Sequence, residues 1–204
     1  MRYCYALFFI LSLVFVGCDN GEKKISDQSF SSMSEMSAET KAQNQNLDKQ
    51  SYQGLENVFQ DSSELQTYGK YLMIVFGKNN CGYCDKLKED IKSNQALQKM
   101  ITDHFSPYYI NISYEKEHHL LFSDHKNQKE ATLLTSELAG RIYQVYATPT
   151  IIFGDSKGKT IFIIPGYIPS QDFQKVLEFI VNGKWKKAKD IKERNKLLSE
   201  YLRD

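Results

Sequence analysis

Two cysteines separated by two residues constrain this chain more than any other feature of the sequence. Cys81 and Cys84 follow the apolar, β-prone run from Tyr71 to Phe76 and open a segment with helical spacing. A cysteine at a helix N-terminus has its sulfur close to unpaired backbone N–H groups and to the positive end of the helix dipole, and both favour the thiolate. Three residues later, Cys84 would lie on the same face of that helix. The spacing therefore predicts a redox-active pair, with Cys81 as the nucleophile and Cys84 as the resolving thiol.

A Cys-x-x-Cys pair can instead form half of a zinc site, so the other possible ligands matter. A closed structural zinc site needs four ligands, and the remaining cysteines, Cys4 and Cys18, are single residues near the start of the chain. The adjacent His118 and His119 lie in a charged stretch, residues 114–131, that is typical of a solvated insertion. We therefore expect dithiol chemistry without a metal or a cofactor, and we interpret the histidines as ordinary surface residues.

The amino terminus indicates export. After Met1-Arg2 an apolar run without charged residues continues to Cys18. Its length fits the roughly 7–15 residues of a signal-peptide core and falls short of the roughly 20 residues that a membrane-spanning helix needs. Its end, the Phe-Val-Gly-Cys sequence at 15–18, resembles a bacterial lipoprotein box, in which a small residue precedes the cysteine that receives lipid. We expect residues 1–17 to be a cleaved signal peptide and Cys18 to be lipidated; an uncleaved anchor or an ordinary signal is the alternative.

Lipoprotein processing would leave one pair of free thiols. Cleavage would remove Cys4, and acylation would use the thiol of Cys18, so that only Cys81 and Cys84 would remain. An exported protein works where disulfides form and persist. We expect a periplasmic protein that a lipid tethers to a bacterial membrane. Asp19, directly after the lipidated cysteine, favours the inner membrane by analogy with enteric bacteria.

The composition of residues 18–50 does not favour folding. They are rich in Ser, Gln, Asn, Glu and Lys and show no hydrophobic period. Such a segment cannot bury enough apolar surface to offset the entropy lost on ordering. We predict a flexible tether, with a partly ordered arm as the alternative.

The charge balance argues against binding to polyanions. The chain carries 26 Lys and Arg residues against 25 Asp and Glu residues, a formal net charge of +1. Without a strong positive field, a nucleic-acid partner is not expected. The 204 residues, 41% of them hydrophobic, suffice for one buried core.

Strand-like and helix-like segments alternate after residue 51. Apolar runs predict strands at residues 71–76, 108–112, 150–153 and 160–164, the last two joined by a hairpin turn. Apolar residues at helical spacing predict helices at residues 84–100, 133–146 and 173–180. This order implies a mixed sheet flanked by helices. The basic segment from Lys184 to Asp204 predicts an amphipathic helix that caps the domain, and docking to a membrane surface or a partner is the alternative.

A second element of the site lies at Thr148-Pro149, where a proline opens the apolar run at residues 150–153. Proline cannot donate to a strand ladder, so it belongs at a strand start or where the backbone meets another segment. Together with the two motif cysteines, this element resembles the thioredoxin superfamily, whose active site pairs a helix-initiating Cys-x-x-Cys motif with a nearby cis-proline. The resemblance implies an α/β thioredoxin fold, a central mixed sheet flanked by helices, with an insertion before the third core helix and a carboxy-terminal helical extension. The domain would span residues 51–185 and the extension 186–204.

The same resemblance implies which residues meet a substrate. It makes the Thr148–Pro149 peptide bond cis and lets the Thr148 backbone pair with a substrate segment as an added strand. Gly82 allows the backbone to lie close to a partner chain, and Tyr83 adds an aromatic surface beside the sulfur. We therefore expect Gly82, Tyr83, Thr148 and Pro149 to bind substrate.

Two segments resemble the catalytic domain of DsbC-type disulfide isomerases and SoxW-like thioredoxins. They are Cys81-Gly-Tyr-Cys-Asp-Lys-Leu87 and Pro165-Gly-Tyr167. The resemblance implies an exported thiol:disulfide oxidoreductase of the reductase or isomerase type, which acts on disulfides in client proteins and is re-reduced by a membrane electron donor. The segment after Cys18 is too short and too polar for the dimerisation domain of such isomerases, so a monomer is expected.

One position departs from the pattern of cytoplasmic-type thioredoxins. Those proteins carry a buried Asp six residues before the first catalytic cysteine, where this chain has Val75. The proton that leaves Cys84 must then go to water or to another group.

Three other functions stay open at this point. A dithiol oxidase would differ only in redox poise, which depends on how far the Cys81 thiolate is stabilised. A lipoprotein could instead carry Cu(I) on Cys81 and Cys84, because thiolates are soft ligands. The third possibility is a non-catalytic surface lipoprotein that keeps the fold only to bind a partner.

Overall fold

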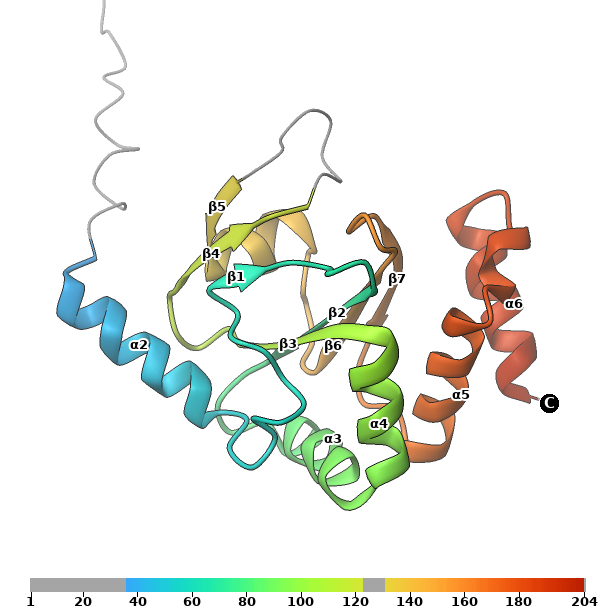
Figure 1. The fold of residues 1–204 in the computed structure, drawn as a ribbon, viewed down its shortest axis with the longest axis horizontal. Coiled ribbons are helices and arrows are strands. Elements are labelled where there is room, and N and C mark those ends of the chain that lie inside the picture. Colours follow the sequence, from blue (N-terminus) through green and yellow to red (C-terminus); the bar gives the residue numbers. More distant parts are fainter. Residues whose placement is uncertain (1–35, 123–130, 204) are drawn as a thin grey trace, which may run out of the picture. The chain divides into compact units, whose positions relative to one another are not determined.

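Strand β2 (Tyr71–Gly77) lies inside the main sheet because both of its faces are apolar, and every residue after Tyr71 is buried. It pairs in parallel with β3 (Phe105–Asn111) and antiparallel with β6 (Thr150–Gly154). Strand β6 also pairs antiparallel with β7 (Thr160–Pro165). The order β3-β2-β6-β7 (Figure 1) is the mixed sheet that the sequence predicts, and the four predicted strands are confirmed.

The computed structural model describes residues 36–122 and 131–203. The expected signal peptide at 1–17, Cys18 and the first part of the expected tether lie outside the described residues, and so does His125, one of the histidines interpreted as surface residues. The described residues from Ser37 onward form one compact unit.

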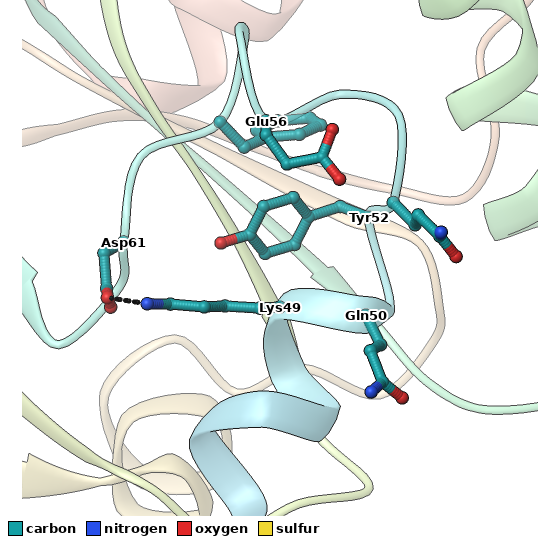
Figure 2. A pocket seen from close by; sticks show the side chains of 7 residues that line it. Lys49, Gln50, Tyr52, Glu56 and Asp61 are labelled. Carbon is teal, nitrogen blue, oxygen red and sulfur yellow. Dashed lines mark ion pairs between the residues drawn. The ribbon is translucent and has the colours of Figure 1, made fainter. Parts of the chain in front are cut away.

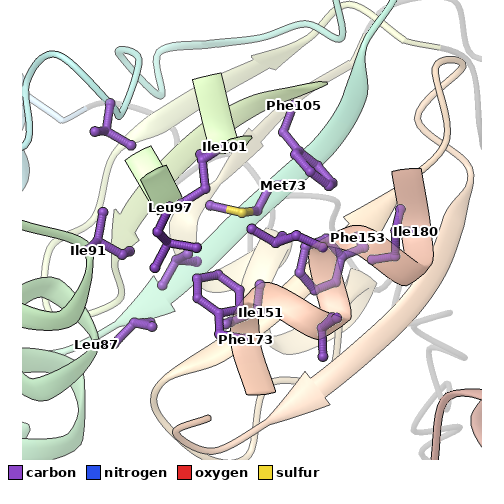
Figure 3. Packing of buried hydrophobic residues seen from close by; sticks show 14 of the residues in the cluster. Met73, Leu87, Ile91, Leu97, Ile101, Phe105, Ile151, Phe153, Phe173 and Ile180 are labelled. Atoms are coloured by element: carbon purple, nitrogen blue, oxygen red, sulfur yellow. The ribbon is translucent and has the colours of Figure 1, made fainter. Parts of the chain in front are cut away.

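Three helices pack on one face of the main sheet: α3 (Gly82–Ser93), α4 (Gln95–His104) and α5 (Ser170–Val181). Met73 points from β2 into this layer, where it packs in a cluster with Leu87, Ile91 and Phe173 (Figure 3). Val75 of the same strand belongs to this cluster. This cluster positions the helix that begins at the cysteine motif.

The single helix predicted at residues 84–100 is in fact two helices. Asn94 lies between them in an extended conformation, with φ −120° and ψ 94°, and its side-chain oxygen accepts a hydrogen bond of 3.0 Å from the Leu97 N–H. Asparagine is a favourable N-cap because it satisfies one of the unpaired amides of the first turn. Asn94 therefore ends α3 and starts α4.

A smaller sheet and a short helix cover the other face. Strands β1 (Glu64–Leu65), β4 (Glu117–Leu120) and β5 (Ala131–Leu134) form a sheet of order β1-β4-β5, followed by the π-helix η1 (Glu137–Ile142). Leu72, Ile74 and Phe76 point from β2 into this second core, where they meet Leu138 and Tyr143.

This region corrects two expectations. The segment 114–131 is not simply a solvated insertion, because β4 lies within it and His118 is fully buried. The helix expected at 133–146 is confined to η1, because Leu133 and Leu134 pair with β4. Neither segment shows the alternation of polar and apolar residues that is typical of a half-buried strand, and the pairing of β4 with β5 decides their structure.

The expected tether is also shorter than its composition indicates. Residues 38–50 form helix α2 (Ala38–Gln50), whose N-cap Ser37 accepts a hydrogen bond from the Thr40 N–H. The helix has no apolar stripe, and its buried residue is the charged Asp48. The prediction of a flexible tether is therefore wrong for residues 38–50. The buried polar residue Asp48, rather than an apolar face, holds this helix on the domain.

The carboxy-terminal segment forms the 3₁₀ helix η2 (Lys184–Lys187) and helix α6 (Ile191–Arg203), which packs against α5 (Figure 1). Leu198 is buried, and the Tyr201 ring lies 5.3 Å from that of Phe179. The predicted capping helix is therefore confirmed. None of the helices in the described ranges is long and apolar enough to cross a membrane.

Candidate active site

Cys81 follows the short loop after β2 and is the N-cap of α3. Its sulfur accepts a hydrogen bond of 3.2 Å from the Cys84 N–H, and a disulfide joins the two residues. Cys81 is 7% exposed and Cys84 is 1% exposed. In the reduced protein the first-turn amides would stabilise a thiolate on Cys81, and Cys81 is the sulfur that a partner can reach more easily.

The Thr148–Pro149 peptide bond is cis, and its loop meets the motif. The carbonyl oxygen of Thr148 lies 3.5 Å from the sulfur of Cys81. Two hydrogen bonds fix the loop: the Gly166 N–H donates to the Pro149 carbonyl at 2.7 Å, and the Thr150 hydroxyl donates to the Ala147 carbonyl at 2.7 Å. The structure thus brings the two predicted elements together.

The Thr148 backbone has room for a further strand. Thr148 precedes β6 and is half-buried, while Tyr146 and Ala147 before it are exposed. No described residue accepts a hydrogen bond from the Thr148 N–H. A free backbone edge next to a reactive sulfur can pair with an extended peptide.

Three tyrosines lie on or next to the elements of the site: Tyr83 in the motif, Tyr146 before the proline loop, and Tyr167 after Gly166, which bonds that loop. Tyr83 is 62% exposed and stacks on Tyr167, with ring centroids 5.9 Å apart and an interplanar angle of 18°. The Tyr167 hydroxyl donates to the Asp90 carboxylate at 2.7 Å, and this hydrogen bond raises the pKa of Tyr167. Tyr146, two residues before Thr148, is 89% exposed. Sequence reasoning found Tyr83 and missed Tyr146, whose signal is a large aromatic residue just before the proline loop.

Gly82 presents open space beside the motif. A Cβ atom added there would meet no heavy atom within 4 Å. The position therefore faces outward, as close approach of a partner chain requires.

The group that receives the proton from Cys84 is not a carboxylate at position 75. Val75 is fully buried, and its partner in the β2–β3 register is Tyr109. Burial raises the pKa of the Tyr109 phenol, so this group stays protonated at neutral pH. The Tyr109 hydroxyl occupies the space of a side chain at Gly77, which explains the glycine there.

Two hollows lie near these elements. One of about 310 Å³ is lined by residues just before the motif, including Lys78 and Asn79, and by Asp85 and Lys88, which form an ion pair of 3.0 Å. The other, of about 470 Å³, lies at the end of α2 (Figure 2). Only the first adjoins the cysteine motif.

The histidines that the structure describes do not assemble a metal site. Within the part of the chain that the structure describes, no three His, Cys, Asp or Glu side chains come together as a metal-binding group. His118, expected at the surface, is buried, and its ring nitrogens lie 2.6 Å from the Ser62 carbonyl and 3.0 Å from the Thr135 hydroxyl. Both ring nitrogens of His118 are therefore engaged in contacts that stabilise the fold.

Comparisons with known proteins agree with this geometry. The model of the thioredoxin-like domain family matches residues 58–180. The solved structure of a thioredoxin-fold protein from Helicobacter pylori is 47% identical, with a TM-score of 0.71, and the match covers 76% of this chain and 96% of that one.

Two further relatives are more distant. An uncharacterized protein from Archaeoglobus fulgidus is 34% identical over 59 residues, which are 28% of this chain and 46% of that protein, so the chain spans less than half of its length. The structure of a disulphide isomerase from Xylella fastidiosa is 16% identical, with a TM-score of 0.32, and the match covers 66% of this chain and 78% of that one. A likeness at this level carries no argument about activity.

Proposed function

Because this chain belongs to the thioredoxin-like domain family, we propose that it is a thiol:disulfide oxidoreductase acting on disulfides in client proteins. One observation carries the proposal: the sulfur of Cys81 caps α3, accepts the Cys84 N–H and lies against the Thr148 carbonyl of the cis-proline loop. This arrangement both activates the sulfur and leaves a backbone edge for a client beside it.

The reaction begins with the reduced pair. The Cys81 thiolate attacks one sulfur of a client disulfide, the client S–S bond breaks, and the other client sulfur leaves as a thiolate. Cys84 then loses its proton and attacks the sulfur of Cys81. The mixed disulfide breaks, the second client thiolate leaves, and the Cys81–Cys84 disulfide forms. Two electrons have passed from the protein to the client.

We assign the protein to the reductase or isomerase type. Support comes from the likeness of the Cys81–Leu87 and Pro165–Tyr167 segments to DsbC-type domains. A donor at the membrane would return two electrons to the pair after each reduction. We also propose that the protein works as a monomer, because the polar composition of residues 18–50 does not favour a dimerisation domain there.

Location follows from the amino terminus. The apolar run and the Phe-Val-Gly-Cys sequence at 15–18 support export, cleavage after residue 17 and lipidation of Cys18. The lipid would hold the protein on the periplasmic side of a bacterial membrane. Asp19, directly after the lipidated cysteine, favours the inner membrane by analogy with enteric bacteria.

The client is an extended, unfolded segment. It pairs with the free edge at Thr148 and lays apolar side chains against the exposed rings of Tyr83 and Tyr146. Gly82 leaves its backbone room to approach the sulfur.

The test is trapping in the native compartment. Cys84→Ala removes the resolving thiol, so mixed disulfides on Cys81 should accumulate, and mass spectrometry would identify each client and its cysteine. Cys81→Ala is the matched control and should trap none. The purified wild-type protein should also reduce the disulfides of insulin, and failure of both assays would refute the proposal.

A further inference from the structure

We propose that Asn79 and Asn111 are positioning residues for Cys81, held in place by the buried Asp48 of helix α2. The inference rests on the proposed role of Cys81 as the nucleophile. It follows from a continuous chain of hydrogen bonds that joins the amino-terminal helix to the loop before the cysteine motif.

The chain starts at a carboxylate whose two oxygens are both used. Asp48 is 1% exposed, and its Oδ1 accepts the Asn111 N–H at 2.9 Å. Its Oδ2 accepts the Ser62 hydroxyl at 3.0 Å and the Lys116 ammonium at 3.2 Å. A buried carboxylate is tolerated only when it is paired and hydrogen-bonded in this way. Asp48 therefore has one position, and it fixes the backbone of Asn111.

A second carboxylate holds the same ammonium. Lys116 Nζ lies 3.1 Å from Asp61 Oδ1, and Asp61 also pairs with Lys49 of α2 at 2.8 Å (Figure 2). Although burial opposes ionisation of Asp61, hydrogen bonds from Lys49 and Ser63 and the Lys116 charge hold the pKa of that carboxyl well below its ordinary value. Asp61 is thus ionised across the physiological range.

The side chain of Asn111, whose backbone Asp48 fixes, in turn holds Asn79. Its Nδ2 donates to Asn79 Oδ1 at 2.8 Å, and its own Oδ1 accepts the Ser113 N–H at 3.0 Å. Asn79 is held twice more, since its N–H donates to the Ser113 hydroxyl at 3.0 Å and its Nδ2 to the Tyr114 hydroxyl at 2.9 Å. An exposed loop residue with this many partners has little freedom.

The fixed residue controls a strained turn. Asn80, between Asn79 and Cys81, has φ +55°, a left-handed conformation that asparagine adopts more readily than most residues but still at a cost relative to glycine. Such a conformation persists when its neighbours impose it. Here Asn79 is pinned on one side and α3 begins on the other, so the turn aims the Cys81 sulfur at the amides of the first helical turn.

Releasing Asn79 should therefore change the chemistry of Cys81. If the turn relaxes, the sulfur moves away from the Cys84 N–H, and the thiolate loses stabilisation. The pKa of Cys81 would rise toward that of free cysteine. The reduced form would be less stable relative to the disulfide, so the protein would become a stronger reductant.

The test uses the purified full chain with Asn79→Ala, Asn111→Ala and the double variant. Asn57→Ala is the control, because the exposed side chain of Asn57 donates to Gln98 and takes no part in the hydrogen bonds of this network. Thiolate absorbance against pH gives the pKa of Cys81, and equilibration with glutathione gives the fraction oxidised. We expect each single variant to shift the glutathione equilibrium about threefold to tenfold toward the disulfide, equivalent to about half to one pKa unit.

The double variant separates positioning from simple destabilisation. Because Asn111 acts on the turn through its hydrogen bond to Asn79, adding Asn111→Ala to Asn79→Ala should give no shift beyond that of Asn79→Ala alone. A lowered melting temperature with unchanged thiolate pKa and glutathione equilibrium would overturn the inference. Asn79 is exposed, so Asn79→Ala keeps the test decisive if Asn111→Ala does not fold. If the wild-type protein reduces no client, the proposed function fails, while the comparison of thiolate pKa values still decides the positioning role.

Discussion

The sulfur of Cys81 lies 3.5 Å from the carbonyl oxygen of Thr148, although 67 residues separate the two in the chain. Cys81 follows strand β2, and Thr148 lies in the loop before β6. These two strands are direct neighbours in the main sheet. The sheet thereby places the Cys81 sulfur next to the backbone edge at Thr148. A client that pairs with this edge would present its disulfide to Cys81 rather than to the buried Cys84.

The two thiols should differ in reactivity. In the reduced protein, iodoacetamide should alkylate Cys81 at least tenfold faster than Cys84, because Cys81 is more exposed and its thiolate is stabilised by α3. Time-resolved mass spectrometry of tryptic peptides measures both rates. In the Cys81→Ala variant, Cys84 should react only after unfolding, and equal rates at both sites would contradict this assignment.

The exposed tyrosines should matter for protein clients and not for small ones. Tyr83→Ala and Tyr146→Ala should each lower kcat/KM for a protein disulfide by about fivefold, a loss of about 1 kcal/mol for a truncated aromatic contact. Reduction of a small aromatic disulfide reagent should stay within a factor of two of wild type. Tyr68→Ala is the control, because Tyr68 is 61% exposed and precedes the opposite end of β2. A similar loss in all three variants would count against a client surface at the motif.

Much of the main sheet and the motif could be predicted because their signals are local. An apolar run predicts β2, and the cysteine spacing after it predicts the start of α3. The cis bond before Pro149 came from the family resemblance, since no local pattern requires it. Asn94 was a readable signal for the break between α3 and α4.

The parts that sequence reasoning missed are held by contacts between distant residues. Helix α2 has no hydrophobic period, and its anchor Asp48 meets partners at positions 62, 111 and 116. His118 is buried because Ser62 and Thr135 satisfy its ring nitrogens. Polar residues that find partners far along the chain look like solvated residues until the fold is known.

Breaking the buried Lys116–Asp48 ion pair by removing one partner should strongly destabilise the protein. Lys116→Met leaves Asp48 without its ammonium partner, and should lower the free energy of unfolding by about 3–5 kcal/mol. Lys41→Met is the matched control, because it breaks the exposed Lys41–Glu117 pair of 2.8 Å and should cost no more than about 1 kcal/mol. Urea denaturation measures both. Equal losses would show that the buried pair does not anchor α2.

Stability should also fall on mild acidification because of His118. Burial, aided by the Lys116 charge, lowers the pKa of His118, against the opposing effects of the Ser62 carbonyl, Asp48 and Glu115. The unfolded chain, with a histidine pKa of about 6.5, then binds a proton more readily than the folded protein does. The stability that neutral His118 contributes is fully present above about pH 6.5 and is lost as the pH falls through the lower folded-state pKa. The urea midpoint should therefore be constant from about pH 8 to 7 and lower at about pH 5.5. His118→Gln removes this titration but leaves the other histidines, so its midpoint should depend less on pH; the same dependence in both proteins would refute the assignment.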